Sequence, residues 1–288
     1  MKQVKIIECP RDAMQGIKSR FIPTKKKALY INSLLNVGFD TVDFGSFVSP
    51  KAIPQMRDTA EVLSLLDLSR THTKLLAIVA NTRGAIDASK FEEIDYLGYP
   101  FSISENFQMR NTHKTIEESI ETLDEILDIA FKTNKEVVAY LSMGFGNPYG
   151  DAYSEELVLD WIQRLVNVGI RNFSLSDTVG LALPAEIESL HARVLQAFPD
   201  LQLSLHLHAH PSKVESKILA ALDSGCRRLE GALLGYGGCP FAEDELVGNV
   251  PTEWWIRALT QRGVTTGIHH EMLHQAQWAA SDLFSRYR

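Results

Sequence analysis

The chain has 288 residues, of which 45% are hydrophobic and 23% are charged, a composition typical of globular proteins with a large core. The formal net charge of −7 argues against a surface for nucleic acid or for anionic membranes, although local basic residues can still bind an anionic substrate. Three widely spaced cysteines, no leader pattern at the N-terminus and no apolar run near the ~20 residues of a membrane span together predict a cytoplasmic protein.

Strand and helix patterns alternate along the whole chain. Eight short runs have the apolar or period-two pattern of strands, at residues 4–9, 41–45, 74–80, 100–104, 136–142, 171–176, 201–210 and 228–232. Each strand is followed by a segment with helical spacing of its apolar residues, at residues 23–38, 54–66, 84–93, 115–132, 154–167, 184–198, 212–223 and 252–262. A last helix is predicted over the tail, residues 268–288.

Eight strand–helix units, with no linker or composition break between them, predict a single α/β domain. The expected fold is a closed (β/α)8 barrel over about residues 3–263, with a helical extension over residues 264–288. An open doubly wound sheet is the alternative, but no G-x-G-x-x-G motif follows the first strand to support it.

The seventh predicted strand carries two histidines on one face. His206 and His208 alternate with leucines, so their imidazoles lie on the same side of the strand, about 6.6 Å apart along it. That spacing allows both rings to reach one metal ion. An H-x-H pattern alone is more often a strand with two hydrogen-bonded histidines, so the rest of the chain must decide.

Functional residues of a barrel gather where its strands end. The predicted strand ends carry Arg11 and Asp12, then Asp43 and Ser46, then Asp177 and Thr178, then His206 and His208, and finally a glycine-rich loop at residues 235–249. A carboxylate, two imidazoles and a nearby amide oxygen suit Mg²⁺, Mn²⁺ or a similar divalent cation.

Plainer interpretations of these residues stay open. Arg11 and Asp12 could form a surface ion pair, and Asp177 could cap the next turn. Cys239 could be an inert turn thiol, or it could lie where a flexible loop closes over a substrate. The other two cysteines, Cys9 and Cys226, are interpreted as structural.

Five segments together resemble the 3-hydroxy-3-methylglutaryl-CoA lyases, within the family of metal-dependent lyases and synthases built on this barrel. They are R-D-A-M-Q at 11–15, S-F-V-S-P-K-A-I-P-Q-M at 46–56, S-L-S-D-T-V-G at 174–180, H-L-H at 206–208 and G-Y-G-G-C-P-F-A at 235–242. The resemblance covers nearly the whole chain. The block at 46–56 and the cysteine loop are its most specific parts.

The resemblance implies a role for each matching residue. The divalent metal, Mg²⁺ or Mn²⁺, would be bound by Asp12, His206, His208 and Asn249. An acyl-CoA substrate would contact Arg11, at its thioester carbonyl, and also Gln15, Lys18 and Ser46. Cys239 would be the catalytic loop thiol, with Asp43 and Asp177 as acid or base carboxylates, and the sequence leaves open which of these three is the acid and which is the base.

The implied reaction is retro-Claisen cleavage of 3-hydroxy-3-methylglutaryl-CoA to acetoacetate and acetyl-CoA, as in leucine degradation, by a homodimer or other homo-oligomer. Several positions depart from the family pattern: Ala13 replaces a glycine, Asp43 replaces a glutamate, residues 209–212 replace Asp-Thr-Tyr-Gly, and Asn249 lies one residue further from Cys239 than usual. A lyase for a different branched 3-hydroxyacyl-CoA and a Claisen-condensing synthase therefore remain alternatives. A non-catalytic protein that binds acyl-CoA or metal is a third.

Overall fold

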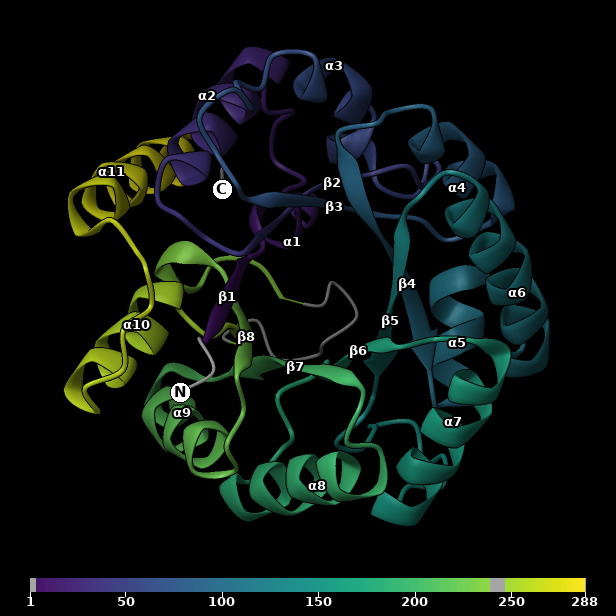
Figure 1. The fold of residues 1–288 in the computed structure, drawn as a ribbon. Coiled ribbons are helices and arrows are strands. Elements are labelled where there is room, and N and C mark those ends of the chain that lie inside the picture. The colour runs from purple at the N-terminus through teal and green to yellow at the C-terminus, as the bar shows by residue number, and fades with distance from the viewer. Residues whose placement is uncertain (1–3, 239–246, 288) are drawn as a thin grey trace.

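Eight parallel strands close into a barrel in the computed structural model, which describes residues 4–238 and 247–287 (Figure 1). The barrel strands are β1 (Lys5–Glu8), β2 (Thr41–Ser46), β3 (Lys74–Ile78), β4 (Ile94–Ser102), β5 (Glu136–Ser142), β6 (Asn172–Asp177), β7 (Gln202–Ala209) and β8 (Arg228–Gly231). Each strand pairs in parallel with the next, and β8 pairs with β1 to complete the ring. The predicted (β/α)8 barrel is thus confirmed.

Helices surround the barrel as an outer ring (Figure 1). They are α2 (Thr24–Leu35), α3 (Thr59–Leu63), α4 (Thr82–Ser89), α5 (Glu105–Thr112), α6 (Ile116–Lys132), α7 (Glu155–Val168), α8 (Pro184–Ala197), α9 (Val214–Asp223) and α10 (Thr252–Gln261). The short helix α1 (Pro10–Gln15) lies inside this ring, beside β2. The C-terminal helix α11 (His270–Tyr287) packs beside α2, as expected for the tail. No helix among the described residues is long and apolar enough to cross a bilayer.

Short elements join these pieces. Three 3-10 helices are η1 (Pro54–Met56), η2 (Pro211–Lys213) and η3 (Leu233–Gly235). The two-residue strand β9 (Gly248–Asn249) pairs antiparallel with the end of β7, so that His208 lies opposite Asn249. This pairing brings the end of the glycine-rich loop to the histidine strand.

Some boundaries differ from the prediction. Residues 10–12, which were expected at the end of the first strand, begin helix α1, because Pro10 at its first position has the backbone angle that a helix requires. Strand β4 begins at Ile94 rather than residue 100, and α5 was not predicted because its few apolar residues give no helical stripe. The single helix expected at 54–66 is split into η1 and α3.

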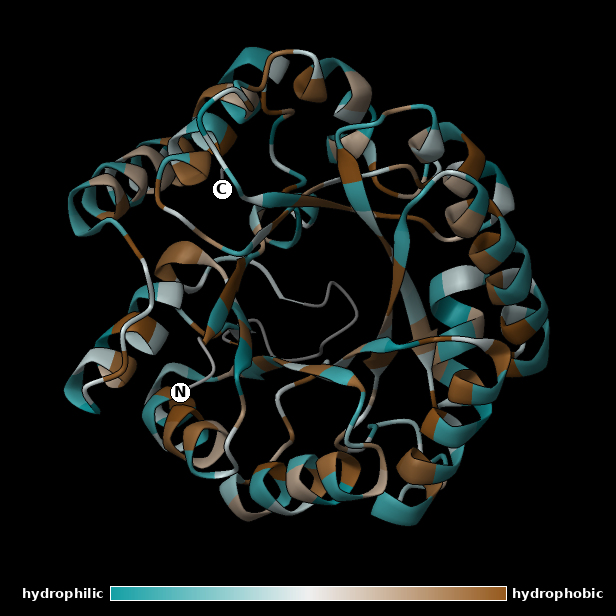
Figure 2. Ribbon diagram, viewed as in Figure 1, coloured by the Kyte–Doolittle hydropathy of each residue, from teal (hydrophilic) through white to brown (hydrophobic). Residues whose placement is uncertain are grey.

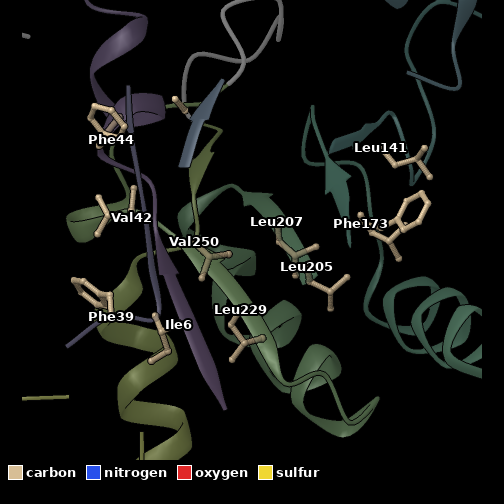
Figure 3. Packing of buried hydrophobic residues seen from close by; sticks show 14 of the residues in the cluster. Ile6, Phe39, Val42, Phe44, Leu141, Phe173, Leu205, Leu207, Leu229 and Val250 are labelled. Carbon is tan, nitrogen blue, oxygen red and sulfur yellow. The ribbon is translucent and has the colours of Figure 1, made fainter. Parts of the chain in front are cut away.

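The strands point alternate residues to the barrel interior and to the helices. On β7, the leucines pack in the core between strands and helices (Figure 3). Ser204 and His206 lie on the opposite face, where both contact Glu230 in the barrel interior. Hydropathy follows the same division in the helix ring, where apolar stripes face the strands (Figure 2). The interior face is therefore where polar side chains meet.

Candidate metal centre

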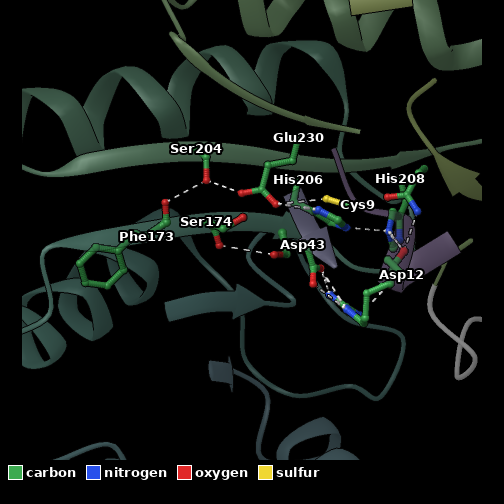
Figure 4. A network of polar contacts seen from close by, with 12 residues as sticks. Cys9, Asp12, Asp43, Phe173, Ser174, Ser204, His206, His208 and Glu230 are labelled. Atoms are coloured by element: carbon green, nitrogen blue, oxygen red, sulfur yellow. Dashed lines mark hydrogen bonds and ion pairs between the residues drawn. The ribbon is translucent and has the colours of Figure 1, made fainter. Parts of the chain in front are cut away.

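Two imidazoles and a carboxylate meet at one end of the barrel. The Nε2 atoms of His206 and His208 are 3.1 Å apart, and His208 Nε2 is 4.0 Å from Asp12 Oδ2 (Figure 4). All three side chains are buried, and their ligand atoms lie within 4.8 Å of one another. Strand β7 supplies both histidines and the first turn of α1 supplies the aspartate, so the cluster joins segments almost 200 residues apart in sequence.

The outer nitrogen of each imidazole already has a partner. His206 Nδ1 is 3.0 Å from a carboxylate oxygen of Glu230, and His208 Nδ1 is 2.8 Å from the carbonyl oxygen of Thr178. Both partners accept hydrogen bonds, which places a proton on each Nδ1 and leaves the Nε2 atoms to face each other. A divalent cation would fit beside these two nitrogens and bind both.

Asp12 and Asn249 complete an oxygen side of the cluster. Burial raises the pKa of Asp12, but the charges of Arg11 and the two histidines outweigh burial and lower the pKa to about 2, so the carboxylate is ionised. Asn249 donates its amide hydrogens to Asp12, at 2.6 Å, and to the carbonyl of Tyr236, at 2.9 Å.

The side-chain oxygen of Asn249 gives the clearest structural indication of a cation site. Its buried Oδ1 has no hydrogen-bond partner among the described residues. A buried amide oxygen without a partner is costly, and a metal ion is the partner that this ligand set suits. The four residues therefore fit a divalent cation by their own chemistry.

The neighbouring loop fits closely against this centre. Gly237 has φ +94°, and a Cβ there would lie 2.7 Å from the Asn249 amide nitrogen and 2.8 Å from the Asp12 carbonyl oxygen. Glycine is required at this approach. Cys239, expected to be the catalytic thiol of this loop, lies outside the described residues.

A buried arginine–carboxylate pair adjoins the metal ligands. Arg11 holds Asp43 through Nε, 3.0 Å from Oδ2, and through Nη2, 2.5 Å from the same oxygen, while its Nη1 is 3.2 Å from Asp12. Burial raises the pKa of Asp43 to about 6, even though the Arg11 charge lowers it. Gln15, one turn along α1, donates to Asp12 Oδ1 at 2.6 Å.

The remaining predicted residues lie outside this cluster. Asp177 is the last residue of β6 and points outward, where Lys217 Nζ is 2.5 Å from its Oδ2 and the Ala182 amide donates to its Oδ1 at 3.1 Å. Ser46 is buried at the end of β2, and Lys18 is exposed beyond α1.

Two buried charged residues beside the histidines were not predicted from the sequence. Glu230 lies two positions after Arg228 on the inner face of β8, so strand periodicity could have identified it. Lys217 falls on the apolar stripe of α9, where a lysine needs a buried partner, and that unexpected charge was the available signal.

Comparisons with known proteins identify the family of this chain. A family model described as HMGL-like matches residues 3–279. The mitochondrial hydroxymethylglutaryl-CoA lyase of Bos taurus is 34% identical over 278 residues, covering 96% of this chain and 84% of that protein. The hydroxymethylglutaryl-CoA lyase YngG of Bacillus subtilis is 34% identical over 282 residues, covering 96% and 92%.

A solved structure gives the same result. The HMG-CoA lyase of Acinetobacter baumannii, in complex with coenzyme A and 3-methylmalate, has a TM-score of 0.90 and 31% identity to this chain. The match covers 98% of this chain and 92% of that one. The resemblance inferred from the five sequence segments is confirmed, and the chain belongs to the HMGL-like family.

Proposed function

We propose that this protein cleaves 3-hydroxy-3-methylglutaryl-CoA to acetoacetate and acetyl-CoA, in a reaction that requires a divalent cation. The observation that carries the proposal is the convergence of Asp12, His206, His208 and the unpartnered Asn249 oxygen beside the Arg11–Asp43 pair. Relatives that are named for this activity support it. The coenzyme A bound to a structural neighbour supports an acyl-CoA substrate.

The metal site determines where the reacting end of the substrate lies. A bound Mg²⁺ or Mn²⁺ supplies Lewis-acid activation of the substrate's tertiary 3-hydroxyl group. Oxygen ligands with two imidazoles suit Mn²⁺ as well as Mg²⁺, so both remain proposed. Arg11 lies next to Asp12, which puts a fixed positive charge where the thioester oxygen is expected.

The chain's own groups then account for the electron and proton movements. A base takes the 3-hydroxyl proton, the C2–C3 bond breaks, and its electron pair forms an enolate whose oxygen is stabilised by the Arg11 guanidinium. Protonation at C2 gives acetyl-CoA, and C3 becomes the ketone carbon of acetoacetate. Asp43 keeps Arg11 in place through two N–H groups and, with a pKa near 6, is also suited to proton transfer.

In this proposal, two of the three candidate groups remain as the acid and the base. Both carboxylate oxygens of Asp177 are taken by Lys217 and the Ala182 amide on the outward side of β6. We therefore assign Asp177 to holding the strand end, and leave Asp43 and the loop thiol of Cys239 as the acid–base pair. Lys18, Gln15 and Ser46 remain proposed contacts of the substrate. Leucine degradation, a cytoplasmic location and a homo-oligomer also remain predictions.

A different branched 3-hydroxyacyl-CoA is the second candidate substrate. Residues 209–212 depart from the family pattern at the end of the histidine strand, and Asp43 is one methylene shorter than the usual glutamate. Asp43 lies beside Arg11, and its shorter side chain leaves more space there than a glutamate would.

Product analysis tests the proposal. The full chain with Mn²⁺ is given 3-hydroxy-3-methylglutaryl-CoA or its 3-ethyl homologue, and acetyl-CoA and the keto acid are measured by mass spectrometry. The proposal predicts equal amounts of acetyl-CoA and acetoacetate from the methyl substrate. Preferred cleavage of the ethyl homologue would favour the second candidate, and cleavage of neither would contradict the lyase assignment. Asp12→Asn serves as the inactive control.

A further inference from the structure

Glu230 is a carboxylate enclosed inside the barrel, directly beside a metal ligand. It is 2% exposed and lies on β8, where the strand register places it next to His206 on β7 (Figure 4). One oxygen is 3.0 Å from His206 Nδ1, and the other accepts the hydroxyl of Ser204 at 2.5 Å. Both oxygens therefore have a partner.

A buried charge needs a reason, because an apolar side chain could fill the same space at less cost. Some interior positions near the site are apolar or aromatic, such as Val138 and Tyr140. Both Glu230 oxygens have a hydrogen-bond donor, one from the His206 imidazole and one from the Ser204 hydroxyl, and these two contacts offset the cost of burying the carboxylate.

The two metal-binding imidazoles have unlike partners. His208 donates from Nδ1 to a neutral backbone carbonyl, that of Thr178, whereas His206 faces a carboxylate. A carboxylate behind an imidazole fixes its tautomer and makes the opposite nitrogen a stronger ligand. Only the His206 side of the centre has a partner that mutation can remove.

We propose that Glu230 is a positioning residue of the metal centre, which accepts the Nδ1 hydrogen of His206 and thereby directs Nε2 toward the cation. The inference rests on the metal site of the proposed function. It adds to that function a residue outside the ligand set and a reason for a charge inside the barrel.

A second cation site that includes Cys9 is the competing explanation for the buried Glu230. Its sulfur, an imidazole nitrogen of His206 and a Glu230 oxygen also lie within 4.8 Å of one another, close enough to hold a second cation. The sulfur is 4.0 Å from the Glu230 oxygen and is enclosed in the barrel, where burial keeps it a neutral thiol by raising its pKa. Hydrogen bonds occupy both Glu230 oxygens, which favours a single cation on the Nε2 side.

Mn²⁺ binding, measured without substrate, distinguishes the positioning role of Glu230 from a second cation site at Cys9. Metal-stripped full-length protein is titrated with Mn²⁺, and free Mn²⁺ is followed by electron paramagnetic resonance in the wild type, Glu230→Gln and Glu230→Leu. The proposal predicts one site per chain and roughly 10- to 100-fold weaker binding in Glu230→Leu. Glu230→Gln keeps an acceptor oxygen without the charge, so its affinity should lie between the two.

Lys135→Met is the matched control for lost stability. Lys135 is a buried cation at the start of β5, where it donates to the carbonyls of Phe91 and Ile94. Its replacement should destabilise the barrel and leave the Mn²⁺ affinity unchanged. Unchanged affinity in both Glu230 variants would overturn the proposal. Two Mn²⁺ per chain, reduced to one by Cys9→Ser, would overturn it in favour of the second site.

The readout is independent of the reaction. If the protein binds Mn²⁺ as predicted but cleaves no 3-hydroxy-3-methylglutaryl-CoA, the proposed function fails while the role of Glu230 stands. If cleavage proceeds and Glu230→Leu binds Mn²⁺ like the wild type, only the role of Glu230 fails.

Discussion

Arg11 connects two carboxylates, that of the proposed metal ligand Asp12 and that of Asp43, which holds the arginine in place. One edge of its guanidinium contacts Asp43 and one nitrogen contacts Asp12, all with buried side chains. A planar group with several fixed donors is required for this geometry, and a lysine ammonium cannot reproduce it.

Arg11→Lys is therefore expected to keep the positive charge and lose the fixed position. We expect kcat/KM for the acyl-CoA to fall by about 10²- to 10³-fold, the usual loss when one preorganised donor to a developing oxyanion is removed. Steady-state kinetics at saturating Mn²⁺ measure the effect. Activity within a few-fold of wild type would show that Arg11 does not stabilise the enolate.

Asp177 and Lys217 form a buried ion pair that can be tested by a double-mutant cycle. Lys217 also donates to the carbonyls of Gly180 and His208, so it ties β6 to the end of β7. Lys217→Met leaves the Asp177 charge unpaired and should cost about 3–5 kcal/mol of unfolding free energy. Adding Asp177→Asn should recover part of that loss in urea unfolding.

Turnover of the same variants bears on the role of Asp177. A residue that only holds the strand end leaves the double variant within about 10-fold of wild-type kcat, since general acid–base catalysis is typically worth 10² to 10⁴. A larger loss in a stably folded double variant would restore Asp177 as acid or base. If the losses of unfolding free energy caused by Lys217→Met and Asp177→Asn were strictly additive, the two side chains would not form a stabilising ion pair.

The sequence was sufficient to predict the orientation of residues on strands with a clear alternation of apolar and polar positions. His206 and His208 were placed on one face because their leucine neighbours fix the period of β7. Asp177 was expected at the barrel mouth because the strand was predicted to stop at residue 176. The strand includes one more residue, and that single step keeps Asp177 on the outward face.

At the scale of elements, Glu8 joins the two ends of the segment that carries the glycine-rich loop. One oxygen of this fully buried carboxyl accepts the Leu233 amide at 2.8 Å, and the other accepts the Thr252 hydroxyl at 2.5 Å. Burial raises the pKa of Glu8 to about 8, even though both hydrogen bonds lower it. The folded protein therefore keeps this carboxyl protonated at neutral pH.

This protonation predicts a pH-dependent stability. Between pH 4.5, the ordinary pKa of a glutamate, and about 8, the unfolded chain releases the Glu8 proton while the folded chain retains it. The contribution of Glu8 is thus fully present below that window and falls by about 1.4 kcal/mol per pH unit as the pH rises through it.

Glu8→Gln resembles the protonated carboxyl and should remove this dependence. Urea unfolding at pH 5, 6, 7 and 8 compares the two proteins. The stability of the wild type relative to the variant should decline steadily toward pH 8. Parallel curves across the four pH values would show that Glu8 is ionised in the folded protein.

Boundaries of elements were the least predictable feature at this scale. Helix α1 has only six residues, too few for a periodic apolar stripe, yet its first turn carries Arg11 and Asp12. The close approach of β9 to β7 depends on tertiary packing of the loop, which local sequence preferences do not determine. The proximity of Asn249 to the histidines came from the family resemblance and not from periodicity.

For the whole molecule, alternating strand and helix patterns were sufficient to predict the closed barrel. Eight parallel strands leave few other arrangements once each is followed by a helix. The interior chemistry was less predictable, because Glu230 and Cys9 meet His206 only when β1, β7 and β8 lie side by side. Contacts across the barrel interior form only when the barrel closes, and no short stretch of sequence shows which residues closure brings together.

In the proposed function, cleavage requires one divalent cation, held by Asp12, His206, His208 and Asn249. Stepwise addition of Mn²⁺ to metal-stripped protein tests this requirement when bound Mn²⁺ and acetyl-CoA release from 3-hydroxy-3-methylglutaryl-CoA are followed in the same samples. Activity should rise in proportion to bound metal and reach its maximum at one Mn²⁺ per chain. Full activity in metal-free protein, or no activity with one Mn²⁺ bound, would show that this requirement is wrong.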